Sequence, residues 1–326
     1  MTRDLTTNLT AMAKTATKPI AQTERELKRI YRKTLEKLRG RIATIYEKYS
    51  TDGSLTYAEM TKYNRMTALE KEIATILNEG NGEAVKKIAR LPKDVYEEAF
   101  FRSGWSVDMA AGVGVKWGML NPDVVGAAVD NPLYHLAIKG MRQNALVAVN
   151  RTIASGLTMG QSFPQMARAM ADTIGRTYND SLRIARTEGM RAMTMGERAA
   201  LDRAEEKGVQ IKEIWTATLD DRTRDSHGDL DGVEKQERGW YVGGVWCDGP
   251  RLSGIAAEDI NCRCTITANI EGLEPTLRRS KEGVVPYTTY KDWRANMEEH
   301  GGQYVPTRYI TLPEERENFE RNTERQ

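Results

Sequence analysis

The sequence predicts a mainly α-helical protein with a small α+β domain near its C-terminal end. Before Gly208, apolar residues recur at spacings of three and four over long stretches, which is typical of amphipathic helices. After Gly208, short segments alternate in polarity and are rich in β-branched and aromatic residues, which favours strands. At 326 residues the chain exceeds the usual size of one domain, so we expect more than one folded unit.

The first eighty residues are expected to form a basic helical hairpin. Helical periodicity runs from 23 to 49 and resumes from 54 to 78, with a turn in "STDGSLTYAEM" between them. Thr23 and Glu26 form a capping-box pattern at the first helix. Residues 1–50 hold twelve Lys and Arg against five Asp and Glu. This excess suits phosphate or an acidic protein surface, and a solvated helix face is the alternative interpretation.

Four regions are predicted along the chain. They are a basic helical arm at 1–80, a helical region at 81–177, an α+β domain at 178–272 and a polar tail at 273–326. Within the α+β domain, a long helix at 178–207 is expected to carry a small sheet built from "VQIKEIWTATL", "GWYVGGVW" and "CRCTITANI". The tail is punctuated by Pro and Gly and ends in charged residues, so we expect it to be partly disordered.

Composition excludes several protein classes. No stretch approaches the roughly 18 apolar residues that span a bilayer, and the opening residues lack the apolar core of a secretory signal. Three cysteines, an odd number, argue against a disulfide framework. We therefore expect a cytoplasmic chain whose cysteines are thiols or metal ligands.

A zinc site is one interpretation of the cysteines. His227, Cys247, Cys262 and Cys264 supply four donors of the types that a tetrahedral zinc requires. Their spacing departs from Cys-x-x-Cys, and residues i and i+2 of a strand share a face without converging well. Cysteines that pack as small apolar side chains, with no cofactor, are the favoured interpretation.

Enzymatic chemistry has weaker support in the sequence. The segment "DDRTRDSH" is rich in carboxylates and could hold a divalent cation for hydrolysis, but it lacks the pattern of a calcium loop. Loop acids of this kind more often form turns and pair with arginines. We expect a protein without enzymatic activity; the alternative is a metal-dependent nuclease or a transferase-type effector that uses His227 with the neighbouring Asp and Cys residues.

An ordered set of short motifs resembles the phage Mu F-like head morphogenesis family, the minor head proteins of tailed phages. The set is Ala-Arg-Thr-Glu, Trp-x-Ala, Asp-x-Arg-Thr-Arg, His-x-x-Leu-Asp-Gly and Asn-Cys-Arg-Cys, and the resemblance covers about residues 140–270. The residues at the motif positions are Arg186, Thr187, Glu188, Trp215, Asp220, Arg222, His227, Leu230, Asp231, Gly232, Asn261, Cys262, Arg263 and Cys264. We expect these residues to be structural.

Cys-Arg-Cys is expected to close the small domain. In a strand, the two cysteines would sit under the His227 loop while Arg263 reaches a carboxylate such as Asp231 or Glu188. The chain also departs from the family, many of whose members carry Cys-x-x-Cys ahead of Leu-Asp-Gly and a His before Asn-Cys-Arg-Cys. Those places hold Arg224 with His227, and Asp259, so Cys247 would have to complete a metal site.

The resemblance implies a low-copy minor head protein that is made in the host cytoplasm and packed inside the head of the virion. The implied partners are the portal protein, scaffold or major capsid protein, with contacts made during head assembly and genome packaging or delivery. Phage DNA is a further expected partner, bound through the basic N-terminal arm, and no membrane is involved during assembly. A nucleic-acid-binding module of the host is a third interpretation, based only on the charge of residues 1–50.

Overall fold

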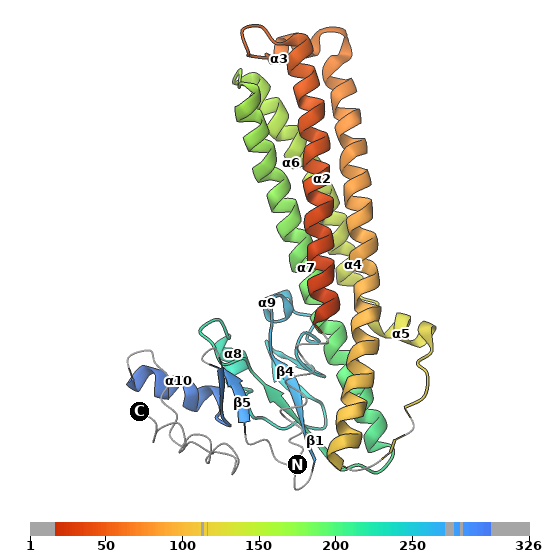
Figure 1. The fold of residues 1–326 in the computed structure, drawn as a ribbon. Coiled ribbons are helices and arrows are strands. Elements are labelled where there is room, and N and C mark those ends of the chain that lie inside the picture. The colour runs from red at the N-terminus through yellow and green to blue at the C-terminus, as the bar shows by residue number, and fades with distance from the viewer. Residues whose placement is uncertain (1–16, 112–113, 116, 271–276, 281–282, 301–326) are drawn as a thin grey trace, which may run out of the picture. The chain divides into compact units, whose positions relative to one another are not determined.

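The structure, a computed structural model, describes residues 17–111, 114–115, 117–270, 277–280 and 283–300. These form two compact units (Figure 1). The helical unit comprises Thr17–Glu97 and Leu120–Ala192. The α+β unit comprises the described residues of 98–119 and 193–300. Among the described helices, none combines the length and the apolar character needed to cross a membrane.

The helical unit is built from long helices that lie side by side (Figure 1). Its elements are α2 (Lys18–Tyr49), α3 (Tyr57–Thr61), η1 (Lys62–Asn64), the first part of α4 (Arg65–Ala111), α5 (Pro122–Val129), α6 (Pro132–Thr158) and the first part of α7 (Phe163–Glu205). Leu27, Leu38 and Ile73 are fully buried, as the apolar periodicity predicts. Each such side chain contributes about 1.5–3 kcal/mol through burial, so apolar packing dominates the stability of this unit.

Small and polar residues set the approach of the helices. A Cβ atom at Gly80 would lie 2.2 Å from the side-chain oxygen of Thr34, so only glycine allows α4 to approach α2 this closely. Tyr31 on α2 donates to Asn81 on α4 at 3.1 Å, and its hydroxyl lies 2.7 Å from that of Ser181 on α7. These contacts satisfy the buried hydroxyl of Tyr31 within an apolar core.

The predicted helices differ from the observed ones in length. The helix predicted at 23–49 is α2, but the stretch predicted at 54–78 is divided into α3, η1 and the start of α4 because Tyr63 adopts a φ of 53°. The helix predicted at 178–207 is the second half of α7, which begins at Phe163. Gly175 is the one glycine between those points, and a helical glycine costs about 1 kcal/mol, too little to end a packed helix.

The α+β unit contains three two-stranded antiparallel sheets. They pair β1 (Ile211–Thr216) with β4 (Thr265–Ile270), β2 (Trp240–Val242) with β3 (Val245–Cys247), and β5 (Leu277–Ser280) with β6 (Gly283–Pro286). Short helices α8 (Asp225–Gly228) and α9 (Ala256–Asp259) lie in the connections, and α10 (Tyr290–Glu299) follows β6. Trp215, Trp240 and Trp293 are fully buried in its core. The predicted fold class, mainly α with a small α+β part, is confirmed.

The predicted regions and the observed units divide the chain differently. The two units draw on interleaved segments, and α4 and α7 each contribute to both, whereas the predicted regions follow one another in sequence. Part of the predicted tail is ordered as β5, β6 and α10, because Tyr290 and Trp293 share one face of α10 and are buried. Residues 301–326, where the rest of that prediction falls, lie outside the described residues.

Candidate functional site

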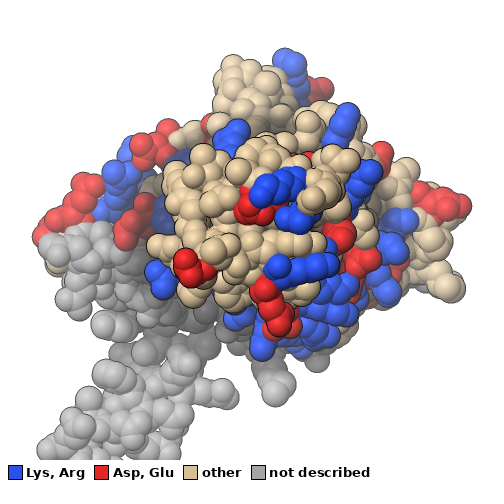
Figure 2. Space-filling model, turned by 90° about the horizontal axis from the view of Figure 1, so that it is seen from above, with Lys and Arg blue, Asp and Glu red and all other residues tan. Residues whose placement is uncertain are grey.

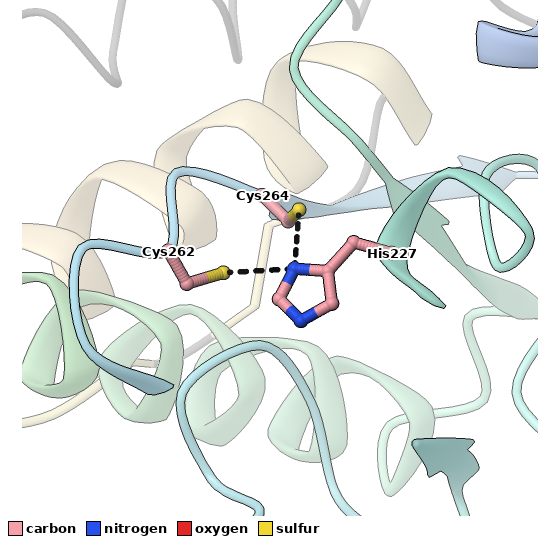
Figure 3. A group of neighbouring side chains, drawn as sticks. All are labelled: His227, Cys262 and Cys264. Carbon is pink, nitrogen blue, oxygen red and sulfur yellow. Dashed lines mark hydrogen bonds between the residues drawn. The ribbon is translucent and has the colours of Figure 1, made fainter. Parts of the chain in front are cut away.

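Three side chains of the α+β unit converge on one point (Figure 3). The Sγ atoms of Cys262 and Cys264 lie 3.5 Å and 3.4 Å from Nδ1 of His227. All three residues are buried, and their ligand atoms lie within 4.8 Å of one another. Cys247, buried on β3, is outside this group. The structure therefore brings together three of the four residues predicted as metal ligands.

The ring of His227 is fixed from two sides. Its Nε2 lies 2.9 Å from a carboxylate oxygen of Glu258 on α9. The centroid of its ring lies 5.5 Å from that of Trp215, and the two rings pack edge to face. Glu258 also accepts a hydrogen bond from Ser226 at 3.0 Å. When the ring proton is on Nε2, the N–H donates a hydrogen bond to Glu258. Nδ1 is then an acceptor that faces both sulfur atoms.

Cys262 and Cys264 lie just before β4. The strand predicted in "CRCTITANI" is observed from Thr265, where pairing with β1 begins, so the cysteines occupy an extended lead-in. Burial nevertheless alternates from Cys262 through Ile270, which places both cysteines on the inner side and Arg263 on the other. A turn at Asn261, whose φ is 59°, precedes them.

Arg251 is a site residue that the sequence did not predict. It is 2% exposed and donates to the backbone carbonyls of Cys262 at 3.2 Å and Cys264 at 2.7 Å. The same guanidinium donates to Thr194 on α7 at 2.5 Å and lies 3.9 Å from the sulfur of Cys262. Its position in "DGPRLSG" is typical of an exposed turn, and no periodicity marks it as buried. Arg251 thus holds the backbone that presents both thiols.

Arg263 pairs with Asp220. Its two terminal nitrogens contact both oxygens of Asp220, one of them at 2.7 Å. Burial raises the pKa of Asp220, but the hydrogen bonds from Arg263 and from the backbone of Arg222 outweigh it and hold that pKa below its usual value. Arg263 thus reaches a carboxylate as expected, but it is Asp220 and not the suggested Asp231 or Glu188, because both of these are engaged elsewhere.

Asp231 connects two elements of the α+β unit through backbone hydrogen bonds. It accepts from the N–H of Ala217, just after β1, at 2.7 Å and from that of Tyr290, at the start of α10, at 2.5 Å. The next residue, Gly232, has a φ of 79° and donates its N–H to Trp215. The Leu-Asp-Gly motif is therefore a turn that fixes β1 against α10.

The Ala-Arg-Thr-Glu motif lies in the helical unit. Arg186 pairs with Glu24 on α2 at 2.5 Å. Glu188 is buried and accepts from Arg191 at 3.0 Å and from Asn131 at 2.9 Å. This motif thus joins helices of the helical unit, whereas the other motif residues lie in the α+β unit.

Two further motif residues have modest contacts. The hydroxyl of Thr187 is buried, and no hydrogen-bond partner is found for it among the described residues. Arg222 is exposed and lies 3.7 Å from Asp220. An exposed pair of this kind is worth little to stability.

Arg224 and Asp259, where the sequence departs from the pattern of the resembling family, hold the backbone here. Arg224 donates to the carbonyl of Ile260 at 2.7 Å. Asp259 accepts from the N–H of Ser253 at 3.2 Å and from that of Gly254 at 2.9 Å. These bonds order the loop that leads into Cys262.

The pKa values of the two clustered thiols are shifted in opposite directions. A hydrogen bond from Cys264 and the proximity of His227 lower the pKa of Cys262, whereas the same bond and burial raise that of Cys264. Burial also raises the pKa of Cys247. The cluster thus directs two sulfur atoms and one imidazole nitrogen at a common point, a donor set suited to a soft or borderline cation.

Comparisons with known proteins agree with the motifs. Residues 148–267 match the family described as phage Mu protein F like protein. The minor head protein GP7 of Bacillus phage SPP1 is 31% identical over 288 residues, which cover 84% of this chain and 92% of that protein. No solved structure gives a significant match.

Two other relatives are longer than the matched region. The NAD(+)–arginine ADP-ribosyltransferase EFV of Enterococcus faecalis is 27% identical over 84% of this chain, and the match spans 57% of that protein. An uncharacterized protein of Haemophilus influenzae is 26% identical over 44% of this chain and 29% of its own length.

The expectation that the chain lacks enzymatic activity is corrected by these relatives, because one of them bears the name of an enzyme and aligns with 84% of the chain. The match to GP7 over almost its entire length decides the family and confirms the resemblance in the motifs. It supports a role in phage head morphogenesis and a location in the virion. The chain belongs to the phage Mu protein F-like family of minor head proteins.

Proposed function

We propose that this chain acts in phage head assembly by contacting the phosphates of phage DNA through one face of α2. The observation that carries the proposal is a basic stripe on α2 in a member of a head-protein family. The six residues of the basic stripe are Arg25, Lys28, Arg29, Arg32, Lys33 and Arg39, and all of them are exposed.

The basic stripe follows from helical geometry. At 100° per residue, its members lie on the side of α2 opposite the buried Leu27, Tyr31 and Leu38. From Arg25 to Arg39 the stripe is about 21 Å long, given a rise of 1.5 Å per residue. Over the same length, duplex DNA carries on the order of a dozen negative charges.

Most charges of the basic stripe form no close ion pair within the described part of the chain, although Glu26 and Glu79 lie near enough to Arg29 and Lys33 to interact electrostatically. Among its six members, only Arg32 forms an ion pair there, with Glu36 at 3.1 Å. By contrast, Lys37 and Arg41 on another flank of α2 pair with acids of α4. The stripe therefore keeps most of its positive charge outside close ion pairs, although Arg39 also donates to the backbone carbonyl of Ala167 on α7, whereas Lys37 and Arg41 are paired.

The end of the helical unit at α3 lacks such an excess. Figure 2 looks onto this end and shows blue and red side chains interspersed around uncharged ones. Lys62 and Glu59 form one such local pair. At this end of the helical unit, positive and negative side chains therefore alternate (Figure 2).

No exposed residue of α2 between Arg25 and Arg39 is aromatic, which favours phosphate contacts over base stacking, and hence binding without sequence preference. In this proposal the chain meets DNA inside the assembling head, after synthesis in the host cytoplasm. An acidic face of the portal, scaffold or major capsid protein is the competing partner.

A salt titration tests the proposal. The full chain and a triple variant, Arg25→Gln with Arg29→Gln and Lys33→Gln, are compared for binding to duplex DNA. The loss of three phosphate contacts should lower the slope of log K against log salt by about 2.7, because each contact contributes about 0.9. The matched control, Lys37→Gln with Arg41→Gln and Lys48→Gln, removes the same charge from another flank and should retain the wild-type slope.

Equal slopes for all three proteins would contradict the proposal. The wild type could instead bind DNA weakly and capture a purified head protein that the triple variant fails to capture. The basic stripe would then bind an acidic protein surface and not DNA.

Transfer of ADP-ribose from NAD(+) to arginine is a second candidate, favoured by the similarity to EFV over 84% of this chain. Incubation of the full chain with labelled NAD(+) and an arginine-rich acceptor protein tests it. Incorporation of label that depends on this chain would support ADP-ribosyl transfer. Incorporation no higher than that of a boiled control would exclude this activity.

A further inference from the structure

We propose that His227, Cys262 and Cys264 bind one zinc ion, with Cys247 excluded from the ligand set. The three ligand atoms are those that converge in Figure 3. The inference concerns the α+β unit alone and does not depend on the proposed binding of DNA.

The separations of the donor atoms fit a tetrahedral zinc. With Zn–S of about 2.3 Å and Zn–N of about 2.0–2.1 Å, tetrahedral angles place the nitrogen about 3.6 Å from each sulfur. The observed separations from Nδ1 of His227 are 3.5 Å to Cys262 and 3.4 Å to Cys264. All three ligand atoms lie within 4.8 Å of one another, so their separations suit a single ion.

The contact between His227 and Glu258 is the second observation. Histidines that bind metals commonly donate their other N–H to a carboxylate, which fixes the tautomer and makes the free nitrogen a better ligand. Glu258, 2.9 Å from Nε2, occupies that position. If the two cysteines served only as apolar packing, no carboxylate would be needed to orient an imidazole nitrogen toward both sulfurs.

Arg251 preorganises the site. Its hydrogen bonds to the carbonyls of Cys262 and Cys264 hold both thiols on one side of the chain. Its guanidinium, 3.9 Å from the sulfur of Cys262, adds positive charge where two thiolates would have to be buried. Zinc supplies the remaining positive charge, since both thiols lose their protons on binding.

The ligand set has an open fourth position. Cys247 is buried nearby on β3, but its sulfur does not belong to the group of mutually close ligand atoms. Three protein ligands with an exchangeable fourth ligand, such as water, are an established coordination pattern of zinc.

Metal content of the full chain is the primary test. Protein made without a histidine tag in zinc-supplemented medium should hold about one zinc per chain by elemental analysis. His227→Gln, Cys262→Ser and Cys264→Ser should each lower this to below about one tenth, whereas Cys247→Ser, the matched control, should retain it.

Two measurements on wild-type protein remain informative even if a ligand variant fails to fold. Cobalt-loaded protein should show the absorption of a tetrahedral ion with a sulfur-to-metal charge-transfer band, and Cys247→Ser should show the same spectrum. Alkylation with mass mapping should find Cys262 and Cys264 protected until a chelator is added. Wild-type protein without zinc and without the cobalt–thiolate band, or loss of metal in Cys247→Ser, would overturn the proposal.

Discussion

The two units of the molecule use charged residues in opposite ways. In the described part of the helical unit, Glu188 is the one buried charged side chain, and the core is otherwise apolar or weakly polar. In the α+β unit, Glu213, His227, Asp231 and Arg251 are all buried. The basic stripe is exposed, whereas Arg251 and Asp231 hold strands and loops together from within. Exposed charge is thus available for binding, and buried charge specifies the fold.

This difference predicts how each unit responds to substitution. The helical unit distributes its stability over many similar apolar contacts. The α+β unit depends on a few buried polar groups, and removal of one leaves several backbone groups without partners.

Arg251→Met should produce the largest loss of stability. It leaves two buried carbonyls and the hydroxyl of Thr194 without this donor, and an unsatisfied buried group costs about 1–3 kcal/mol, so we expect a loss of about 4 kcal/mol in the α+β unit. Hydrogen exchange resolved by peptide measures this loss in each unit separately. Equal loss of protection in the helical unit would contradict the contrast between the units.

Leu38→Ala is the counterpart in the helical unit. Leu38 is fully buried on α2, and truncation of such a leucine costs about 3 kcal/mol through lost burial and the cavity that remains. Hydrogen exchange should show weaker protection in α2 and the helices that pack on it. A strand β1 that loses as much protection would show that the two units unfold together.

Glu197→Gln should flatten the dependence of stability on pH. Burial raises the pKa of Glu197 to about 7, and its Oε2 accepts no hydrogen bond among the described residues. The folded state keeps the proton between pH 4.5 and about 7 while the unfolded state releases it, so stability is fully present below pH 4.5 and falls as pH rises through 7. The loss should be about 2 kcal/mol once partial exposure is allowed for. Urea unfolding at pH 5 and pH 8 measures the fall in the free energy of unfolding. An equal fall in Glu197→Gln would mean that another titrating group causes it.

Arg263→Ala should have the smallest effect of these substitutions. The side chain of Arg263 is 33% exposed, which places the pair with Asp220 near the lower end of charge-assisted hydrogen bonds, at about 1.5 kcal/mol. Unfolding in urea at low and high salt measures the loss. An unchanged unfolding midpoint would mean that the pair is fully screened by solvent.

Sequence periodicity predicts the helical unit well because a helix buries one face in a regular repeat. The positions of Leu27, Leu38 and Ile73 follow from that repeat. Alternation of polarity also marks β1 and β4 as strands, but the single sheet predicted from three segments is wrong, because β1–β4 and β2–β3 form separate two-stranded sheets.

The candidate site was predictable only in part. His227, Cys262 and Cys264 are recognisable from their donor types, and the structure brings them together. Arg251 was not predictable, because it lies in a turn rich in Gly and Pro, and its burial depends on contacts formed only after the chain has folded. Likewise, the choice of Asp220 over Asp231 as the partner of Arg263 depends on the hydrogen bonds by which Asp231 fixes β1 and α10.

The salt dependence of DNA affinity, measured for the stripe variant and for Arg251→Met side by side, tests the central claim most directly. The claim predicts that the variant with Arg25, Arg29 and Lys33 replaced by Gln loses about 2.7 from the salt slope, while its unfolding free energy stays within about 0.5 kcal/mol of the wild type. Arg251→Met should keep the wild-type slope although its α+β unit is destabilised. The opposite result, an unchanged slope in the stripe variant or a reduced slope in Arg251→Met, would contradict the separation of binding charge from structural charge.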